Sequence, residues 1–242
     1  MKMLKSKSFW IALIAIAIAV SGTAYFTKSR IKISFENDQN VEAGTGISES
    51  VNKNISFANG AEEPFKKGHT FLREKKLDDA LREFERAAQL SPETALAHYW
   101  VGMTDYYKKE FEKAIAQFKK VLEIEPKNYR ALAMIGRILA LNKSKIDQAI
   151  TYLNDSLSIN PDFAEARFDL ARIYALKGDM KHSIAEFALI FRAERNYAMY
   201  HYELGRILES AKAVEQAKKE YQRALQLNPG FSNAREAYEK LK

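Results

Sequence analysis

The sequence repeats itself at intervals of about 34 residues, and no other feature constrains the fold as strongly. Decapeptides of helix-forming composition end in proline at this spacing or twice it: EFERAAQLSP (83–92), QFKKVLEIEP (117–126), YLNDSLSINP (152–161) and EYQRALQLNP (220–229). The gap before the last copy is filled by EFALIFRAER (186–195), which has Arg195 in place of the proline. A period of this length predicts similar supersecondary units stacked in a row, each burying its apolar side against its neighbours.

Aligning the decapeptides divides most of the chain into five units. They occupy 61–94, 95–128, 129–163, 164–197 and 198–231. The third unit has one extra residue, which falls in LNKSKIDQA, a predicted turn where an insertion costs little. Proline cannot continue a helix interior, so the repeated prolines mark the points where a helix ends or the next unit begins.

Each unit carries the pattern expected of two packed antiparallel helices. The eighth position is small, which lets two helices approach closely: Gly68, Gly102, Gly136, Ala171 and Gly205. The twentieth position is also small: Ala80, Ala114, Ala149, Ser183 and Ala217. Four residues later, on the same helical face, stands a large apolar side chain: Phe84, Phe118, Leu153, Phe187 and Tyr221. This order predicts one close helix–helix contact in every unit.

The order of small, large and proline positions resembles the tetratricopeptide repeat. YWVGMTDYY…EKAIAQFKKVLEIEP and YELGRILES…EQAKKEYQRALQLNP carry it most completely, and the resemblance covers about 170 residues. Arg195, Ser183 and Leu153 depart from the family pattern at single positions without breaking the period. The resemblance implies an all-α, right-handed α-solenoid of about five helix pairs, with a concave groove lined by the first helix of each pair.

Residues 232–242, SNAREAYEKLK, predict a capping helix at the end of the repeats. Ser232 is a residue type that caps helix N-termini. An apolar face is formed by Ala234, Ala237, Tyr238 and Leu241, with charged residues opposite. A solenoid needs such a terminal helix to shield its last repeat from water.

The N-terminal segment accounts for most of the basic charge. Residues 1–32 hold six basic residues and no acid, against a net charge of +7 for the whole chain. The repeats therefore have an ordinary mixed surface, which argues against a nucleic-acid partner. No charge occurs between Lys7 and Lys28, and the apolar run from Phe9 to Val20 has two interpretations: a retained transmembrane anchor or a cleaved signal peptide.

We favour the anchor over the signal peptide. Twenty uncharged residues at about 1.5 Å each span one hydrocarbon thickness, and Trp10 and Tyr25 lie near its ends like the aromatic belts of membrane proteins. We therefore expect one N-terminal transmembrane helix within 1–32 and a single-pass protein, in a bacterium an inner-membrane protein with its repeats in the periplasm. Residues 33–60 are rich in Asn, Ser, Gly and Glu and predict a flexible, acidic linker.

The resemblance implies that positions 2, 5, 9, 12 and 13 of each unit face the groove. Position 5 is mostly aromatic, either as packing common to the family or as a binding surface, and position 9 holds three consecutive arginines. Arginine suits carboxylates and phosphates, but Glu165, Asp169, Glu203 and Glu209 are near enough in sequence to pair with these arginines instead. The candidate partner-binding residues are Phe65, Tyr99, Arg130, Arg137, Phe168, Arg172, Tyr202 and Arg206.

The sequence contains no recognisable catalytic, metal or cofactor motif. Its four histidines are scattered over different units without metal-ligand spacing, cysteine is absent, and no glycine-rich phosphate loop occurs. We therefore expect no enzymatic activity, no bound metal and no cofactor.

The function predicted from the sequence is a non-enzymatic scaffold or adaptor at the membrane. It binds an extended segment of a protein or peptide partner in the groove, and an acidic partner suits the arginines best. Two alternatives stay open: a structural solenoid that self-associates into homo-oligomers, and an assembly factor for exported proteins of the cytochrome or pilus biogenesis type. The last rests on analogy alone.

Overall fold

The computed structural model describes residues 60–192 and 197–242. The predicted anchor within 1–32, all but the last residue of the linker 33–60, and Arg195 lie outside the described residues. Within the described part every regular element is helical, with eleven α-helices and one short 3₁₀ turn. The predicted all-α fold of repeated helix pairs is confirmed.

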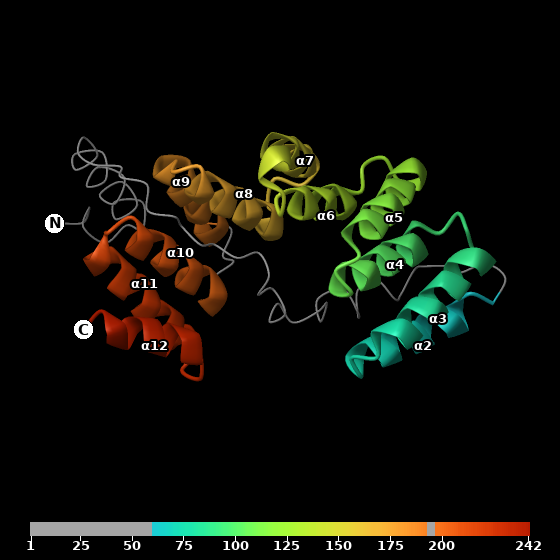
Figure 1. The fold of residues 1–242 in the computed structure, drawn as a ribbon, viewed down its shortest axis with the longest axis horizontal. Coiled ribbons are helices and arrows are strands. Elements are labelled where there is room, and N and C mark those ends of the chain that lie inside the picture. The colour runs from blue at the N-terminus through green and yellow to red at the C-terminus, as the bar shows by residue number, and fades with distance from the viewer. Residues whose placement is uncertain (1–59, 193–196) are drawn as a thin grey trace. The chain divides into compact units, whose positions relative to one another are not determined.

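The helices fall into two compact units, divided after Pro161. The described first unit holds three pairs and a 3₁₀ turn: α2 (Glu62–Arg73) with α3 (Leu77–Leu90), α4 (Ala95–Tyr107) with α5 (Phe111–Ile124), and α6 (Tyr129–Leu139) with α7 (Ile146–Ile159) after the turn η3 (Lys143–Lys145). The second unit holds α8 (Ala164–Leu176) with α9 (Met180–Arg192), α10 (Ala198–Ser210) with α11 (Val214–Leu227), and the single helix α12 (Ser232–Lys240). Figure 1 shows these pairs in chain order.

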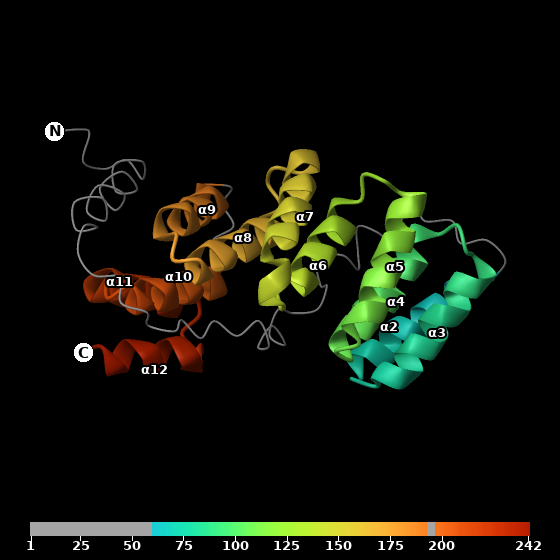
Figure 2. The same cartoon turned by 45° about the horizontal axis from the view of Figure 1, so that its top comes forward.

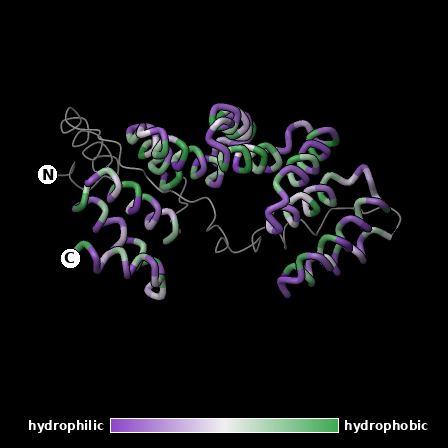
Figure 3. Tube along the Cα trace, in the orientation of Figure 1, coloured by the Kyte–Doolittle hydropathy of each residue, from purple (hydrophilic) through white to green (hydrophobic). Residues whose placement is uncertain are grey.

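The small residue at position 8 allows the two helices of a pair to touch. A Cβ atom added to Gly68 would lie 2.6 Å from the Phe84 ring, and one added to Gly205 would lie 2.6 Å from the Tyr221 ring. The large side chains at position 24 are fully buried in both units: Phe84, Phe118, Leu153, Phe187 and Tyr221. In Figure 3 apolar and polar residues alternate along each helix, as expected when one face packs and the other meets solvent.

Neighbouring pairs in the first unit are joined by aromatic contacts. The helices α2, α3, α4 and α5 lie side by side in both views (Figures 1 and 2). Trp100 on α4 stacks on Phe84 of α3 with ring centroids 5.9 Å apart, and it meets His69 of α2 edge-on at 4.4 Å. The extra residue of the third pair is taken up by η3, so the insertion lengthens the turn between α6 and α7.

The two ends of the repeat array differ from its interior in polarity. The face of α2 formed by Glu63, Lys67 and Thr70 is exposed, whereas the matching residues of α4, which are Ala97, Val101 and Thr104, are buried against the preceding pair. On α12, Glu236 and Glu239 replace the aromatic and glycine that elsewhere contact the second helix of a pair. Neither end therefore offers an apolar face to a further repeat.

The start of α12 differs from the expectation for Ser232. The N-cap residue is Phe231, which makes no side-chain capping hydrogen bond, and Ser232 is the first helical residue. The predicted apolar face of the helix does pack: Ala234 is fully buried, and Ala237, Tyr238 and Leu241 lie against the core of the second unit.

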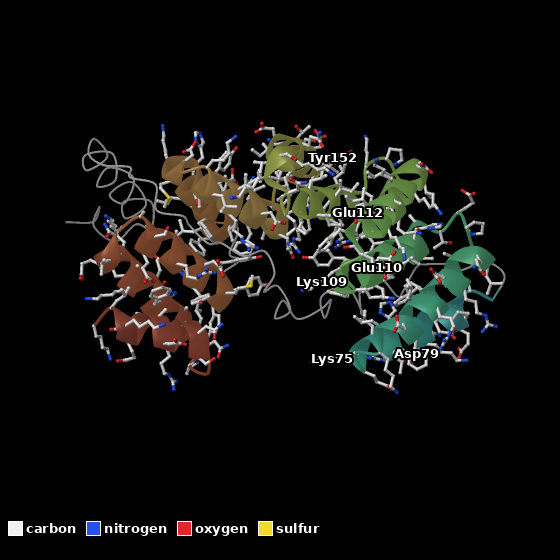
Figure 4. The ribbon with its side chains drawn as sticks, in the orientation of Figure 1. Lys75, Asp79, Lys109, Glu110, Glu112 and Tyr152 are labelled. Atoms are coloured by element: carbon white, nitrogen blue, oxygen red, sulfur yellow. The ribbon has the colours of Figure 1, made fainter. Side chains whose placement is uncertain are left out.

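Several turns inside the pairs use a left-handed residue. Lys75, Lys109 and Lys212 have φ of 59°, 64° and 63°, and Gly178 has φ of 79° at the matching position. Lys75 lies at the turn between α2 and α3, and Lys109 at the turn between α4 and α5 (Figure 4). The backbone N–H of Lys109 donates to the Tyr106 carbonyl and that of Glu110 to the Asp105 carbonyl, which satisfies the last carbonyls of α4.

Replacing Lys109 by glycine is expected to raise the free energy of unfolding by up to about 1 kcal/mol, because a left-handed backbone costs a non-glycine residue about 1–2 kcal/mol and the greater freedom of unfolded glycine offsets part of that gain. Gly178→Ala is expected to lower the free energy of unfolding by about 1 kcal/mol. No atom lies within 4 Å of the added Cβ, so the substitution creates no steric clash. Urea denaturation followed by circular dichroism should show a higher free energy of unfolding for Lys109→Gly and a lower one for Gly178→Ala. Changes of the same sign in both variants would contradict this account of the turns.

Candidate functional site

The predicted aromatic residues at position 5 are mostly core residues. Phe65 is 3% exposed, Tyr99 8% and Phe168 3%. Each ring packs against the large residue at position 24 of its own pair, with centroids 5.6 Å apart for Phe65–Phe84 and 5.5 Å for Tyr99–Phe118. These three rings therefore support the helix pair from within the core, and their predicted part in partner binding stays a prediction.

Tyr202, the fourth predicted aromatic, is half-exposed and lies between two other rings. Its ring lies 5.8 Å from Tyr221 and 5.0 Å from Phe231. Burial raises the pKa of the Tyr202 phenol, so the phenol stays a neutral hydrogen-bonding group near pH 7. The Tyr221 phenol donates to Glu209 at 2.6 Å, and its pKa is raised by burial and by that carboxylate.

The two predicted arginines of the second unit contact side chains of that unit. Arg172 is 2% exposed, and its guanidinium lies over the Phe168 ring at 5.4 Å. Arg206 donates to Glu203 at 3.1 Å and lies over the Tyr202 ring at 5.9 Å. The pairing between an arginine and a nearby acid, which the sequence left open, is present at Arg206.

The two predicted arginines of the first unit have different surroundings. Arg130 is half-exposed and lies over the ring of Tyr129 at 5.1 Å. Arg137 is half-exposed and close enough to the Tyr107 phenol to affect its ionisation. Burial raises the pKa of Tyr107 and the Arg137 charge opposes that rise. Tyr107 on α4 therefore supplies a neutral hydrogen-bond donor beside the positive charge of Arg137 on α6.

A half-exposed aromatic and apolar surface surrounds these two arginines. We call it the first-helix face of the first unit, and it consists of His69, Leu72, Arg73, Met103, Tyr106, Tyr107, Arg130 and Arg137 on α2, α4 and α6. The His69–Trp100 contact connects α2 to α4, the Tyr106 and Tyr107 rings lie 5.9 Å apart, and Arg137 brings α6 beside Tyr107. Sequence reasoning missed Tyr106 and Tyr107 as site residues, although positions 12 and 13 were the signal.

The charge of this face comes from arginine. At positions 2, 5, 9, 12 and 13 of α2, α4 and α6, Glu62 is the single acid, and it is ion-paired with Lys66 at 2.7 Å. Burial, together with the charge of Arg73, lowers the pKa of His69 to about 4, so His69 is neutral at pH 7. The same positions of α8 and α10 balance Arg172 and Arg206 with Glu165 and Glu209. The cationic surface therefore belongs to the first unit.

Tyr, Met and Arg are enriched where proteins bind other proteins, because they combine large contact area with directional polar groups. A hollow of about 500 Å³ is lined by Glu125, Pro126, Lys127 and Asn128, in the turn that precedes Tyr129 and Arg130 in sequence. Over residues 60–192 and 197–242 no group of three or more His, Asp or Glu side chains could hold a metal ion. The Tyr, Met and Arg side chains of the first-helix face suit the recognition of a polypeptide.

Comparison with protein families gives matches along most of the repeats. Models described as "Tetratricopeptide repeat" match residues 65–129, 140–207 and 198–231. Among curated proteins, Protein O-mannosyl-transferase TMTC3 of Homo sapiens is 25% identical over an alignment of 179 residues that covers 67% of this chain and 19% of that protein. Anaphase-promoting complex subunit 7 of Dictyostelium discoideum is 24% identical over 213 residues, which are 87% of this chain and 34% of that protein. The chain thus spans about a fifth to a third of these relatives.

Solved structures show the same fold. A thermophilic TPR protein of Thermus thermophilus superposes with a TM-score of 0.66 at 20% identity, covering 75% of this chain and 98% of that one. YrrB, described as a TPR protein with an unusual peptide-binding site, superposes with a TM-score of 0.52 at 22% identity, covering 75% and 93%. Among the helices that the structure describes here, none has the length and apolar character needed to cross a membrane.

Proposed function

Because the chain belongs to the tetratricopeptide-repeat family, we propose that it is a non-enzymatic scaffold that binds a protein partner through the first-helix face of the first unit. The observation that carries the proposal is the half-exposed group of Tyr106, Tyr107 and Arg137, in which the Arg137 charge lies close enough to the Tyr107 phenol to affect its ionisation. An extended partner segment with carboxylates beside apolar side chains fits this chemistry, since arginine pairs with carboxylates and tyrosine packs on apolar groups.

The proposal extends to the membrane through the N-terminal segment. The apolar run from Phe9 to Val20 and its flanking basic residues support an anchor, with the repeats on the far side of the membrane from the N-terminus. In a bacterium the repeats would then collect an exported partner at the inner membrane. Alkaline extraction of membranes tests the anchor: release of an N-terminally trimmed protein would instead indicate cleavage.

Charge reversal tests the binding face. Arg130→Glu with Arg137→Glu is expected to weaken partner capture by about tenfold or more, because acidic groups of the partner would lose two cations and meet two like charges. Lys119→Glu with Lys120→Glu is the matched control, since both lysines are exposed on α5 and the change in charge is the same. Crosslinking and mass spectrometry of the full-length protein in its native membrane measures capture.

Two results would overturn the proposed face. The first is an equal loss of partner capture in the arginine and lysine double variants. The second is no loss of capture in the arginine variant while circular dichroism shows that this variant is folded. The alternative of a structural solenoid that self-associates stays open; the polar faces of α2 and α12 disfavour only an end-to-end contact. The assembly factor for exported proteins remains compatible with the proposed face.

A further inference from the structure

Lysines gather at the three turns inside the helix pairs of the first unit, residues 74–76, 108–110 and 140–145. Six lysines and two acids occur there: Lys75, Lys76, Lys108, Lys109, Lys143, Lys145, Glu74 and Glu110. The three turns therefore carry a net charge of +4. The described first unit as a whole, residues 60–161, has 17 Lys and Arg residues against 15 Asp and Glu residues. The excess positive charge of the unit is thus concentrated at these turns.

The three turns lie next to one another along one edge of the first unit, which we call the basic edge. The Lys108 ammonium donates to Asp78 at 2.6 Å, which connects the second turn to the start of α3, directly after the first turn. The Arg137 charge reaches the Tyr107 phenol, so the end of α6 lies beside the end of α4, where the second turn begins. The turns between successive pairs have no such excess of lysine, since their charged residues are Glu93, Glu125 and Lys127.

Four lysines of the basic edge are exposed and are not neutralised by an acid of the unit. Among residues 60–161, no ion pair involves Lys75, Lys109, Lys143 or Lys145. The ion pairs around the edge use other cations: Glu74–Lys76, Asp78–Lys108, Asp79–Arg82 and Glu110–Lys113. Glu112 and Asp147 lie in the first turns of α5 and α7, where the helix N-terminus favours a carboxylate. Figure 4 shows Lys75 and Lys109 at the same side of neighbouring pairs.

Half-exposed apolar side chains flank these lysines. Leu72 lies before the first turn, Phe111 follows the second, and Leu141 and Ile146 lie at the third. Lysines beside apolar groups are typical of surfaces that lie on a membrane, because the apolar groups enter the headgroup region while the ammonium groups meet phosphates. Lysine is also a point charge on a flexible stem and lacks the rigid fork of arginine. A row of lysines on successive turns therefore suits a layer of anionic headgroups better than one carboxylate in a fixed geometry.

We propose that the basic edge of the first unit lies on an anionic lipid surface and binds its headgroups through the four exposed lysines. This inference rests on the proposed attachment to a membrane, and it adds a lipid contact that is separate from the partner-binding face. Each basic residue near an anionic surface strengthens association by about fivefold, and salt screens the attraction. Two points of attachment, the proposed anchor and the basic edge, would together fix the orientation of the first unit on the membrane.

The absence of cysteine allows a single fluorescent label to report on the lipid contact. Ser144→Cys places the label on the basic edge, and Glu93→Cys places it on an exposed turn between pairs as the control position. The full-length protein is reconstituted in phosphatidylcholine vesicles that contain nitroxide-labelled headgroups, with or without about 30% phosphatidylglycerol. We expect strong quenching at position 144 with phosphatidylglycerol, and weak quenching without it or at position 93. Raising the salt from about 0.05 to about 0.5 M should remove the strong quenching.

Neutralising lysines on the other two turns tests which charges hold the edge on the lipid. Lys75→Gln with Lys109→Gln should lower the ratio of quenched to unquenched label at position 144 by about tenfold or more. Lys119→Gln with Lys120→Gln is the matched control, because both lysines are exposed on α5 of the same unit and the change in charge is equal. This control should keep the quenching, and circular dichroism should show that both double variants are folded.

Several results would overturn the inference. They are equal quenching with and without phosphatidylglycerol, equal quenching at positions 93 and 144, and quenching that survives Lys75→Gln with Lys109→Gln. Release of the label from the vesicles by an equimolar amount of duplex DNA would assign the basic edge to nucleic acid instead. Sedimentation with phosphatidylcholine vesicles at about 0.5 M salt reports on the anchor separately. Weak quenching at position 144 in a protein that still sediments with the vesicles would therefore overturn the basic edge and leave the proposed function intact.

Discussion

Phe118→Ala is expected to lower the free energy of unfolding by about 3–5 kcal/mol, because it empties a fully buried site that the surrounding helices cannot refill. The Phe118 ring is 0% exposed, meets Tyr99 edge-on at 5.5 Å and lies 3.1 Å from where a Cβ on Gly102 would stand. The ring thus joins α4 and α5 at the centre of the first unit. Its removal weakens the support of Met103, Tyr106 and Tyr107 as well.

Trp100 gives the measurement a local signal. It is 5% exposed. The chain has two tryptophans, and the second is Trp10 in the N-terminal segment. Urea denaturation followed by the fluorescence of a Trp10→Phe background therefore reports on the first unit. Lys120→Ala, an exposed change on the same helix, should stay within about 0.5 kcal/mol. A loss below about 1 kcal/mol for Phe118→Ala would show that position 24 is not a core position.

Asp105→Asn is expected to stabilise the protein by up to about 3 kcal/mol at pH 8 and by less than about 1 kcal/mol at pH 4. Asp105 is 3% exposed on α4, and burial, together with the Glu110 charge, raises the pKa of its carboxyl to about 6. The folded state holds the proton more tightly than the unfolded state, whose carboxyl has the ordinary value of 3.8. The charged form therefore lowers stability above pH 6, and this cost disappears as the pH falls toward 4.

The comparison must be made between variants, because His69 acts in the opposite direction. Its pKa is lowered to about 4 by burial, so the unfolded state takes up a proton first as the pH falls below 6.5, and stability is lost over the same range. Subtracting the wild-type curve from the Asp105→Asn curve removes the His69 contribution. Asp78→Asn is the control: its carboxylate accepts from Lys108 at 2.6 Å and its pKa is lowered, so the sign should reverse. A pH-independent Asp105→Asn difference would contradict the assignment.

The helix pairs could be predicted because the signals that determine them are local and repeated. Gly68 and Phe84 recur at matching positions of other units, and each copy supports the others. The turn insertion before α7 was also visible, since it shifts the small residue at position 20 by one. These features depend on volume and spacing, which a sequence records directly.

The site could be predicted only in part, because exposure depends on which residue a side chain meets across the pair. Phe65 and Tyr99 have the composition of a binding surface, yet they meet Phe84 and Phe118 inside the core. Arg206 pairs at 3.1 Å with Glu203, three residues earlier, and the shared repeat position of the arginines does not predict this pair. The raised pKa of Asp105 arises from burial and from the charge of Glu110, and no sequence motif predicts it.

Site-specific photocrosslinking tests the central claim, that the first-helix face of the first unit holds the partner. A photoreactive phenylalanine derivative is placed at Tyr107 on α4 or, as the matched position on the second-helix side, at Lys120 on α5. The account predicts a discrete adduct in native membranes from position 107, reduced about tenfold by Arg137→Glu, and none from position 120. Adducts from position 120 that equal or exceed those from position 107, with no effect of Arg137→Glu, would contradict it.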